Sequence, residues 1–248
     1  MKTPAVLATI ERRILVNYRV DAEVLAKMVP SPFRPVVVDG CGIAGICLIR
    51  LGDIRPKGLP AALGVTTENA AHRVAVEWDS PTGTAEGVLI PRRDTSSALV
   101  GLMGGRVFPG WHHRAHFRVE EEHDRWALDI ASFDGDVSVG VKARRSSELP
   151  PGSVFSSMEV ASEFFRAAPV GYSCSRTPGL LEGVALETDE WRIEPLTVEE
   201  LRSSFFESPN FPKGSAEFDS AFLMTGIYSV WNAVPSIRFE RQPSAALT

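Results

Sequence analysis

Short segments in which apolar and polar residues alternate recur along most of this chain, and this pattern constrains the fold more than any other feature. In residues 13–20, for example, the apolar side chains Ile14, Val16, Tyr18 and Val20 fall on one face, as in a half-buried strand. Turn residues such as Asp39-Gly40 separate these segments. The other strands are predicted at residues 33–38, 43–51, 66–78, 84–90, 116–119, 126–133 and 137–144, with a further strand region at 171–191.

Helical patterns are few and short. The pattern predicts helices at residues 21–29, after Asp94-Thr95 as far as Gly104-Gly105, and at 156–168. Thr197 and Glu200 have capping-box spacing and predict one more helix, while residues 52–64 are expected to form a loop. Strands and helices do not alternate, which argues against a parallel βαβ sheet. We therefore expect a β-dominated α+β fold: one domain over residues 1–248, with an antiparallel sheet and helices outside it.

Composition excludes several classes of protein. Hydrophobic residues make up 44% of the chain and charged residues 23%, as in globular proteins. The net charge of −5 argues against a nucleic-acid binder or a protein that binds anionic membranes. No apolar run approaches the ~20 residues of a membrane span, and no signal peptide is evident. We expect a soluble, cytoplasmic protein without nucleic-acid or membrane partners.

The cysteines and histidines predict no metal site and no disulfide framework. The three cysteines contain no CxxC pair, and Cys41 and Cys47 lie in an apolar stretch typical of small buried side chains. His112 and His116 share a strand face but lie ~13 Å apart at ~3.3 Å per residue, too far to hold one ion. Neither a GxGxxG motif nor a P-loop is present. The sequence therefore predicts no metal and no cofactor.

Two polar segments border apolar strands and are candidates for the wall of a pocket. Residues 67–73 include Glu68, His72 and Arg73, and Arg92-Arg93 directly follows the strand predicted at 84–90. Neighbouring side chains of a strand point to opposite faces, so only one of Arg92 and Arg93 turns inward if the strand continues. The alternatives are a solvated strand end for the first segment and a surface Arg–Asp pair for the second.

The order of these segments resembles the acetoacetate decarboxylase-like superfamily. The opening RILVNYRVDAEVLAKMVPSPFRPVVVDG is similar to the start of that superfamily, and Thr67-Glu68 stands where the family has an active-site Thr-Glu. Ile90-Pro91-Arg92-Arg93 stands where the decarboxylases have Tyr-Pro-Lys-Lys. The hairpin DGCGIAGICLIRLGDIRPKGLP and the segment GLLEGVALETDEWRIEPLTVEE resemble the uncharacterised bacterial YqjF-like branch. The resemblance implies a β-cone, a closed barrel-like sheet with short outer helices, and a habit of forming homo-oligomers.

The resemblance breaks at the residues that carry decarboxylase chemistry. Both family lysines are replaced, by Arg92 and Arg93, and a guanidinium is too basic to form a Schiff base. Lys142 lies on a strand pattern, off its apolar face, and is a poor substitute. We therefore expect no Schiff-base decarboxylase.

The resemblance still implies a central pocket for a small organic acid. Arginine suits carboxylate recognition, and a buried Glu68 suits proton transfer. On this interpretation Glu68 and Arg92 are the candidate catalytic residues. The candidate substrate-binding residues are Arg92, Arg93, His72 and, from the first strand, Arg13 or Arg12. The expected activity is a proton-transfer step of the lyase, hydratase or cyclase type, and the alternative is a binding protein without catalysis. The family precedent favours Arg92 as the arginine that faces inward.

Overall fold

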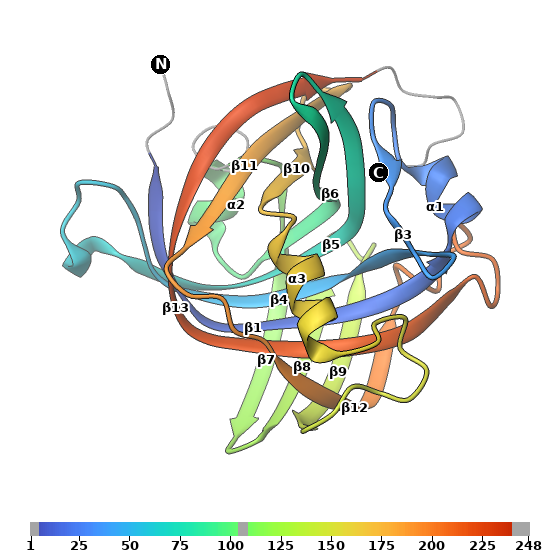
Figure 1. The fold of residues 1–248 in the computed structure, drawn as a ribbon. Helices are drawn as coiled ribbons and strands as arrows, with labels where there is room; N and C mark the ends of the chain where they lie inside the picture. Colours follow the sequence, from blue (N-terminus) through green and yellow to red (C-terminus); the bar gives the residue numbers. More distant parts are fainter. Residues whose placement is uncertain (1–4, 104–108, 240–248) are drawn as a thin grey trace.

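The computed structural model describes residues 5–103 and 109–239, and most of these residues lie in β-strands (Figure 1). The strands are β1 (Val6–Asp21), β2 (Arg34–Pro35), β3 (Val37–Val38), β4 (Cys41–Pro56), β5 (Val65–Ser80), β6 (Gly83–Thr95), β7 (His112–Glu122), β8 (Arg125–Ser132), β9 (Ser138–Arg145), β10 (Val170–Cys174), β11 (Leu180–Thr188), β12 (Glu194–Ser203) and β13 (Ala216–Arg238). The helices are α1 (Ala22–Met28), α2 (Ala98–Met103) and α3 (Met158–Arg166), with a 3-10 turn at Ala61–Leu63.

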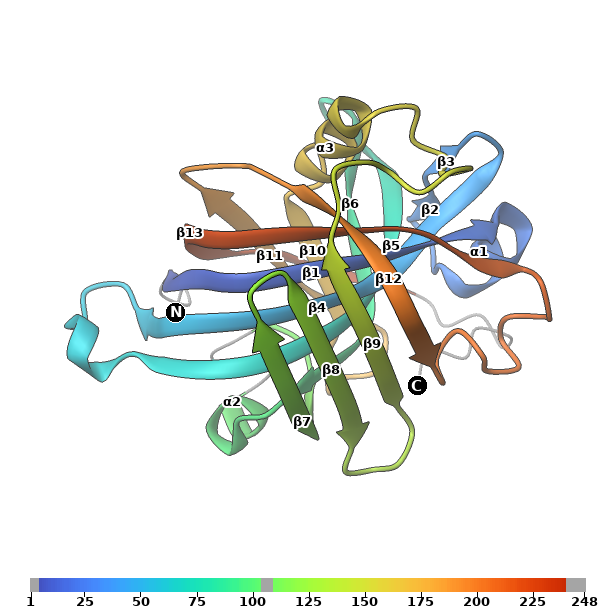
Figure 2. The same ribbon diagram turned by 90° about the horizontal axis from the view of Figure 1, so that it is seen from below.

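The strands close into a ring. They pair in the order β13, β1, β4, β5, β6, β10 and β11, and β11 returns to pair with β13. Strands β7, β8, β9 and β12 cross beneath β1 and β4 and join the ring through β6 and β13 (Figure 2). The expected β-dominated, barrel-like fold is thus confirmed. One departure is that β6 pairs in parallel with β10 and with β7 over three residues each, so the sheet is mixed rather than wholly antiparallel.

The alternation of side chains along β1, β4 and β5 produces two separate layers of core. One face, with Ile14, Leu48 and Val74, packs toward β8, β9 and β12 in the larger core. The other face, with Leu15 and Ala71, points into the ring, where Phe165 of α3 packs against it. Because successive side chains of a strand point to opposite faces, neighbouring residues of these strands alternate between the inside of the ring and the core beneath it.

Two expectations about local structure are corrected. Thr197 and Glu200 do not begin a helix: they lie in β12, which pairs with β9 and β13 and buries Leu196 completely. Pairing on both sides and burial of Leu196 outweigh the capping-box pattern, which is a local preference only. The loop expected at residues 52–64 is shorter, because β4 continues to Pro56.

The helices begin where their caps predict. The side chain of Asp21 accepts a hydrogen bond from the backbone of Glu23 at 2.9 Å, and the side chain of Ser157 caps α3. The expected end of α2 at Gly104-Gly105 lies outside the described residues. Over the described ranges, we find no helix with the length and apolar character needed to span a membrane.

Candidate functional site

The ring of strands encloses a cavity of about 230 Å³. Much of its wall is apolar and comes from side chains such as Ile49, Val88, Trp191 and Trp231. The C-terminal end of α3 lies against the same cavity through Phe165. A mostly apolar cavity with a few convergent polar groups is the usual form of a small-molecule site.

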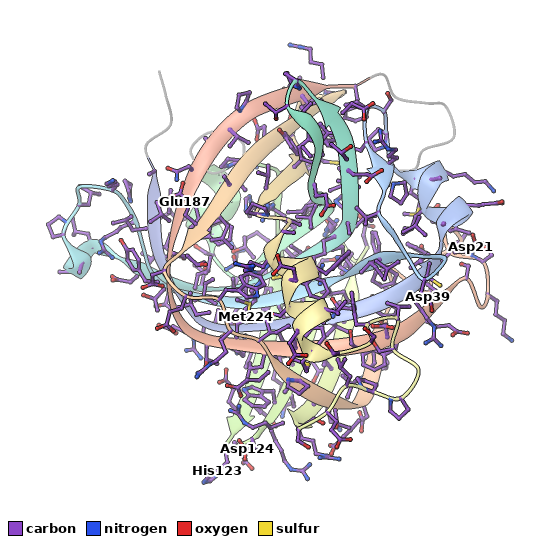
Figure 3. All side chains as sticks on the ribbon, in the orientation of Figure 1. Asp21, Asp39, His123, Asp124, Glu187 and Met224 are labelled. Carbon is purple, nitrogen blue, oxygen red and sulfur yellow. The ribbon has the colours of Figure 1, made fainter. Side chains whose placement is uncertain are left out.

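Three arginines from three strands of the ring line this wall: Arg13 of β1, Arg73 of β5 and Arg93 of β6. Within the described residues, none of the three makes an ion pair with a carboxylate. The Cys47 sulfur lies 3.2 Å from Nε of Arg13, and the sulfur of Met224, labelled in Figure 3 beside α3, lies 4.0 Å from Nη1. Among the described residues, no carboxylate therefore pairs with the positive charge of these three side chains.

The other contacts of these arginines are with neutral groups. Arg73 donates a hydrogen bond to the side chain of Asn17, and its Cζ lies 4.9 Å from the ring centre of Phe165. Arg93 donates from Nε to the Ser173 hydroxyl at 2.7 Å. Burial lowers the pKa of Arg73 and the pKa of Arg93 to about 10, so both stay charged at neutral pH.

His112 also lines the cavity and is neutral. Burial, with a smaller effect of Arg93, lowers its pKa to about 3. Its Nδ1 lies 3.1 Å from the carbonyl oxygen of Gly110, and because a carbonyl only accepts, Nδ1 carries the proton. This tautomer leaves Nε2 with a lone pair that can accept a proton.

Four of the predicted site residues lie on the opposite face of the ring strands. Arg12 is buried and forms ion pairs with Glu68 and Glu121. His72 is fully buried, and its ring stacks on Phe205 with a centroid distance of 4.3 Å. These groups belong to the core between the ring and the β7–β9 layer.

Arg92 is the fourth predicted residue on that opposite face. Its Nη2 donates to Asp94 and to Asp134, both at 2.8 Å. Arg12, Glu68, His72 and Arg92 are therefore absent from the cavity wall, and of the predicted set Arg13 and Arg93 line it.

The expectation that Arg92 faces inward is corrected by a bulge in β6. His72 of β5 pairs with Arg92 and Val74 pairs with Leu89, so two residues of β6, Ile90 and Pro91, lie opposite one residue of β5. The extra residue reverses the alternation, which places Val88, Ile90 and then Arg93 toward the cavity. Pro91 has no N–H to offer the ladder and is the one sequence signal for this irregularity.

The sequence interpretation did not place His112 and Cys47 in a pocket, and it named Arg73 only as part of a candidate pocket segment, whereas all three line the cavity. Arg73 belongs to the same polar segment as Glu68 and His72. It is next to His72 on β5, so its side chain points to the other face of the strand. His112 lies near Arg93 because β6 and β7 pair in parallel, with Arg93 opposite His112.

Comparisons with known proteins agree with this fold. The DUF2071 family model, described as an uncharacterized conserved protein, matches residues 8–227. No curated protein matches the chain. The enduracididine biosynthesis enzyme MppR, in a complex with pyruvate, superposes with a TM-score of 0.62 at 11% identity, covering 97% of this chain and 91% of that one.

Two further solved structures superpose on this chain to a similar extent. Acetoacetate decarboxylase from Legionella pneumophila has a TM-score of 0.60 at 13% identity, with 94% of this chain and 88% of that chain covered. An acetoacetate decarboxylase-like enzyme from Sphingomonas wittichii RW1 has a TM-score of 0.57 at 12% identity, with 97% and 94% covered. At such low identity these similarities establish a common fold.

Proposed function

The chain belongs to the DUF2071 family and has an acetoacetate decarboxylase-like fold, and we propose that its cavity binds a small organic acid through Arg13, Arg73 and Arg93. The observation that carries this proposal is the absence, within the described residues, of any carboxylate paired with these three guanidinium groups. A buried cation without a counter-charge is costly, and an anionic ligand supplies that charge. Guanidinium groups bind carboxylates by paired hydrogen bonds.

The shape of the cavity supports an organic acid over an inorganic anion. The carboxylate would lie against the arginines, while the apolar wall around Trp191 and Trp231 would contact the hydrocarbon part. Pyruvate, which is named in the complex of MppR, is an acid of this class. In this proposal Arg92 and Glu68 hold strands together through ion pairs instead of touching the ligand.

The activity we propose is a proton transfer of the lyase, hydratase or cyclase type, without a Schiff base. None of the lysines in the described residues lines the cavity. His112 offers Nε2 as the proton acceptor, and the arginines would stabilise negative charge that develops on the ligand. Fixed charges act more strongly in a mostly apolar cavity than in bulk water.

A second candidate is a binding protein without catalysis, and one observation favours it. The pKa of His112 is lowered to about 3, whereas a general base works best with a pKa near the working pH. Asp94 also lines the wall, but its carboxylate is held by Arg92 at 2.8 Å.

A thermal-shift series with pyruvate, acetoacetate and propionate tests the binding site. Saturating acid, at about one hundred times its dissociation constant, stabilises the wild type by about 2.7 kcal/mol. The Arg93→Gln variant should lose most of this stabilisation. Arg166→Gln is the matched control, since Arg166 also lines the cavity but is paired with Glu163. Equal loss in both variants would place the anion site elsewhere.

Proton exchange separates an enzyme from a binder. If the cavity catalyses proton transfer, the methyl protons of pyruvate should exchange with deuterated water faster in the presence of the protein, as measured by NMR. The His112→Asn variant should abolish the acceleration while it still binds the acid. Binding without any acceleration in the wild type would favour the binding protein.

A further inference from the structure

The three cavity arginines hold their positive charge at two separate places on the wall. Arg13 and Arg73 make up the first place, against strand β1, and we call these two residues the β1 pair. Nε of Arg13 lies 3.2 Å from the sulfur of Cys47 on the neighbouring strand, and Arg73 donates a hydrogen bond to the side chain of Asn17 in β1. Burial and, to a smaller extent, the charge of Arg13 lower the pKa of Arg73, so each of these cations lies in the field of the other.

The guanidinium of Arg93 lies against a different strand, β10. Its Nε donates to the Ser173 hydroxyl at 2.7 Å, and a side chain at Gly171 would begin 4.0 Å from its Nη2. Because Gly171 lines the cavity and has no side chain, there is room for a ligand atom in front of Nη2. The carboxylate of Glu182 accepts a hydrogen bond from the backbone of Gly110 at 2.6 Å and, among the described residues, forms no ion pair with Arg93.

Strands β1 and β10 lie on opposite sides of the ring. From β1, the strand pairings reach β10 through β13 and β11 in one direction and through β4, β5 and β6 in the other. In Figure 1, β1 and β4 form the lower side of the ring, and β10 and β11 lie on its upper side. Neighbouring strands are ~4.8 Å apart, so the guanidinium of Arg93 and the β1 pair face the cavity from different walls.

Mostly apolar side chains line the cavity between these two places. Ile49 of β4 lies on one side of the ring, and Val184 and Leu186 of β11 lie on the other. Asn69 also lines this part of the wall, but its side chain donates a hydrogen bond to the Thr67 hydroxyl at 2.8 Å. Arginine binds a carboxylate at ~2.7–2.9 Å, so one carboxylate serves the cations of one wall only. A ligand that neutralises both places therefore needs an anionic group at each end and a hydrocarbon segment between them.

We propose that the ligand of this cavity is a dicarboxylic acid, with one carboxylate on Arg93 and the other on the β1 pair. This inference rests on the proposed function and names the substrate class of the same site. An acid with a single carboxylate occupies Arg93, whose Nη groups make no hydrogen bond within the described residues. The second carboxylate of a diacid then reaches Arg73, whose buried Nε has no hydrogen-bond partner in the described part of the chain, and Arg13 of the same wall.

Matched pairs of acids test for the second carboxylate site. Succinate, adipate and suberate have the same numbers of carbons as butyrate, hexanoate and octanoate, and each differs from its partner by a second carboxylate. Isothermal titration calorimetry at pH 7 measures the dissociation constant of each acid. In at least one pair the diacid should bind the wild type on the order of tenfold more tightly than the monoacid, as hydrogen bonds to a charged group allow. Diacids that bind no more tightly than their partners at all three lengths would overturn the proposal.

Variants assign the two carboxylates to the two walls. Arg13→Gln should remove the advantage of the diacid and leave the affinity for the monoacid unchanged, which also shows that the variant is folded. Arg93→Gln should weaken the binding of both acids. Arg166→Gln should change neither, since Arg166 lines the cavity but is paired with Glu163. An advantage of the diacid that survives Arg13→Gln would mean that the β1 pair does not bind the second carboxylate, and the proposal would be wrong.

The same titrations distinguish failure of this inference from failure of the acid site. If monoacids bind the wild type but not Arg93→Gln, and diacids have no advantage, the acid site stands and the second carboxylate site is wrong. If no acid of either kind binds, the proposed function itself is wrong.

Discussion

Arg92→Gln should destabilise the protein, whereas the same substitution at the adjacent Arg93 should not. Arg92 is 3% exposed and bonds to Asp94, whose side chain is fully buried. Arg92→Gln therefore leaves a buried carboxylate without its counter-charge. Breaking a buried pair in this way costs about 3–5 kcal/mol. At roughly 2–4 °C per kcal/mol for a chain of this size, the melting temperature should fall by about 6–20 °C.

Arg93→Gln removes a cation that has no carboxylate partner within the described residues. Burial lowers the pKa of Arg93 to about 10, against ~12.5 for an exposed guanidinium. At ~1.4 kcal/mol per pKa unit, the charged form costs the folded state up to roughly 3 kcal/mol at neutral pH. The hydrogen bond from Arg93 to Ser173 offsets part of this, and the side chain is partly exposed. We expect the apo variant to be as stable as the wild type or more so.

Urea unfolding of the two variants and the wild type at pH 7, without added carboxylates, measures both effects. Arg19→Gln is the control for loss of an arginine on the surface, where its pair with Glu217 is worth at most about 1 kcal/mol. If Arg93→Gln loses as much stability as Arg92→Gln, then Arg93 has a counter-charge in the folded protein, and the bulge does not separate the environments of the two side chains.

Burial lowers the pKa of His72 to about 3, so the unfolded chain takes up a proton near pH 6.5 before the folded chain does. The free energy of unfolding should therefore fall by up to ~1.4 kcal/mol per pH unit as the pH decreases from 6.5 to 3. Urea unfolding of His72→Leu over this range should show a weaker dependence of stability on pH. The same dependence in the variant and the wild type would contradict this. Leu196→Ala should cost about 2–5 kcal/mol because Leu196 is completely buried, whereas Thr197→Ala should cost less than ~0.5 kcal/mol, unlike removal of a helix cap. Borohydride with pyruvate should give no adduct on lysine by mass spectrometry, and a stoichiometric lysine adduct would place an amine in the cavity.

Local patterns in the sequence were enough to predict most of the strands and the first and third helices. Alternation in residues 13–20 is a property of the strand itself, and Asp21 caps α1 through its own backbone neighbours. The replacement of two family lysines by Arg92 and Arg93 also argued against Schiff-base chemistry, because a guanidinium lacks a neutral amine in any fold. These inferences needed no knowledge of tertiary contacts.

Tertiary pairing decided which residues face the cavity. Whether Arg92 or Arg93 turns inward depends on the bulge at Ile90-Pro91, which exists only in the pairing of β6 with β5. The same kind of non-local pairing made residues 194–203 a strand despite the helix signal at Thr197.

The cavity itself depends on strands that lie far apart in the chain. Arg13, Arg73 and Arg93 come from β1, β5 and β6. No local sequence pattern predicts that the three side chains line the same cavity. An arginine on a strand is equally compatible with a surface ion pair, as Arg19 shows, and with an unpaired position in a cavity. Burial and the position of the nearest carboxylate separate these cases, and both are properties of the closed ring of strands rather than of the residues beside each arginine.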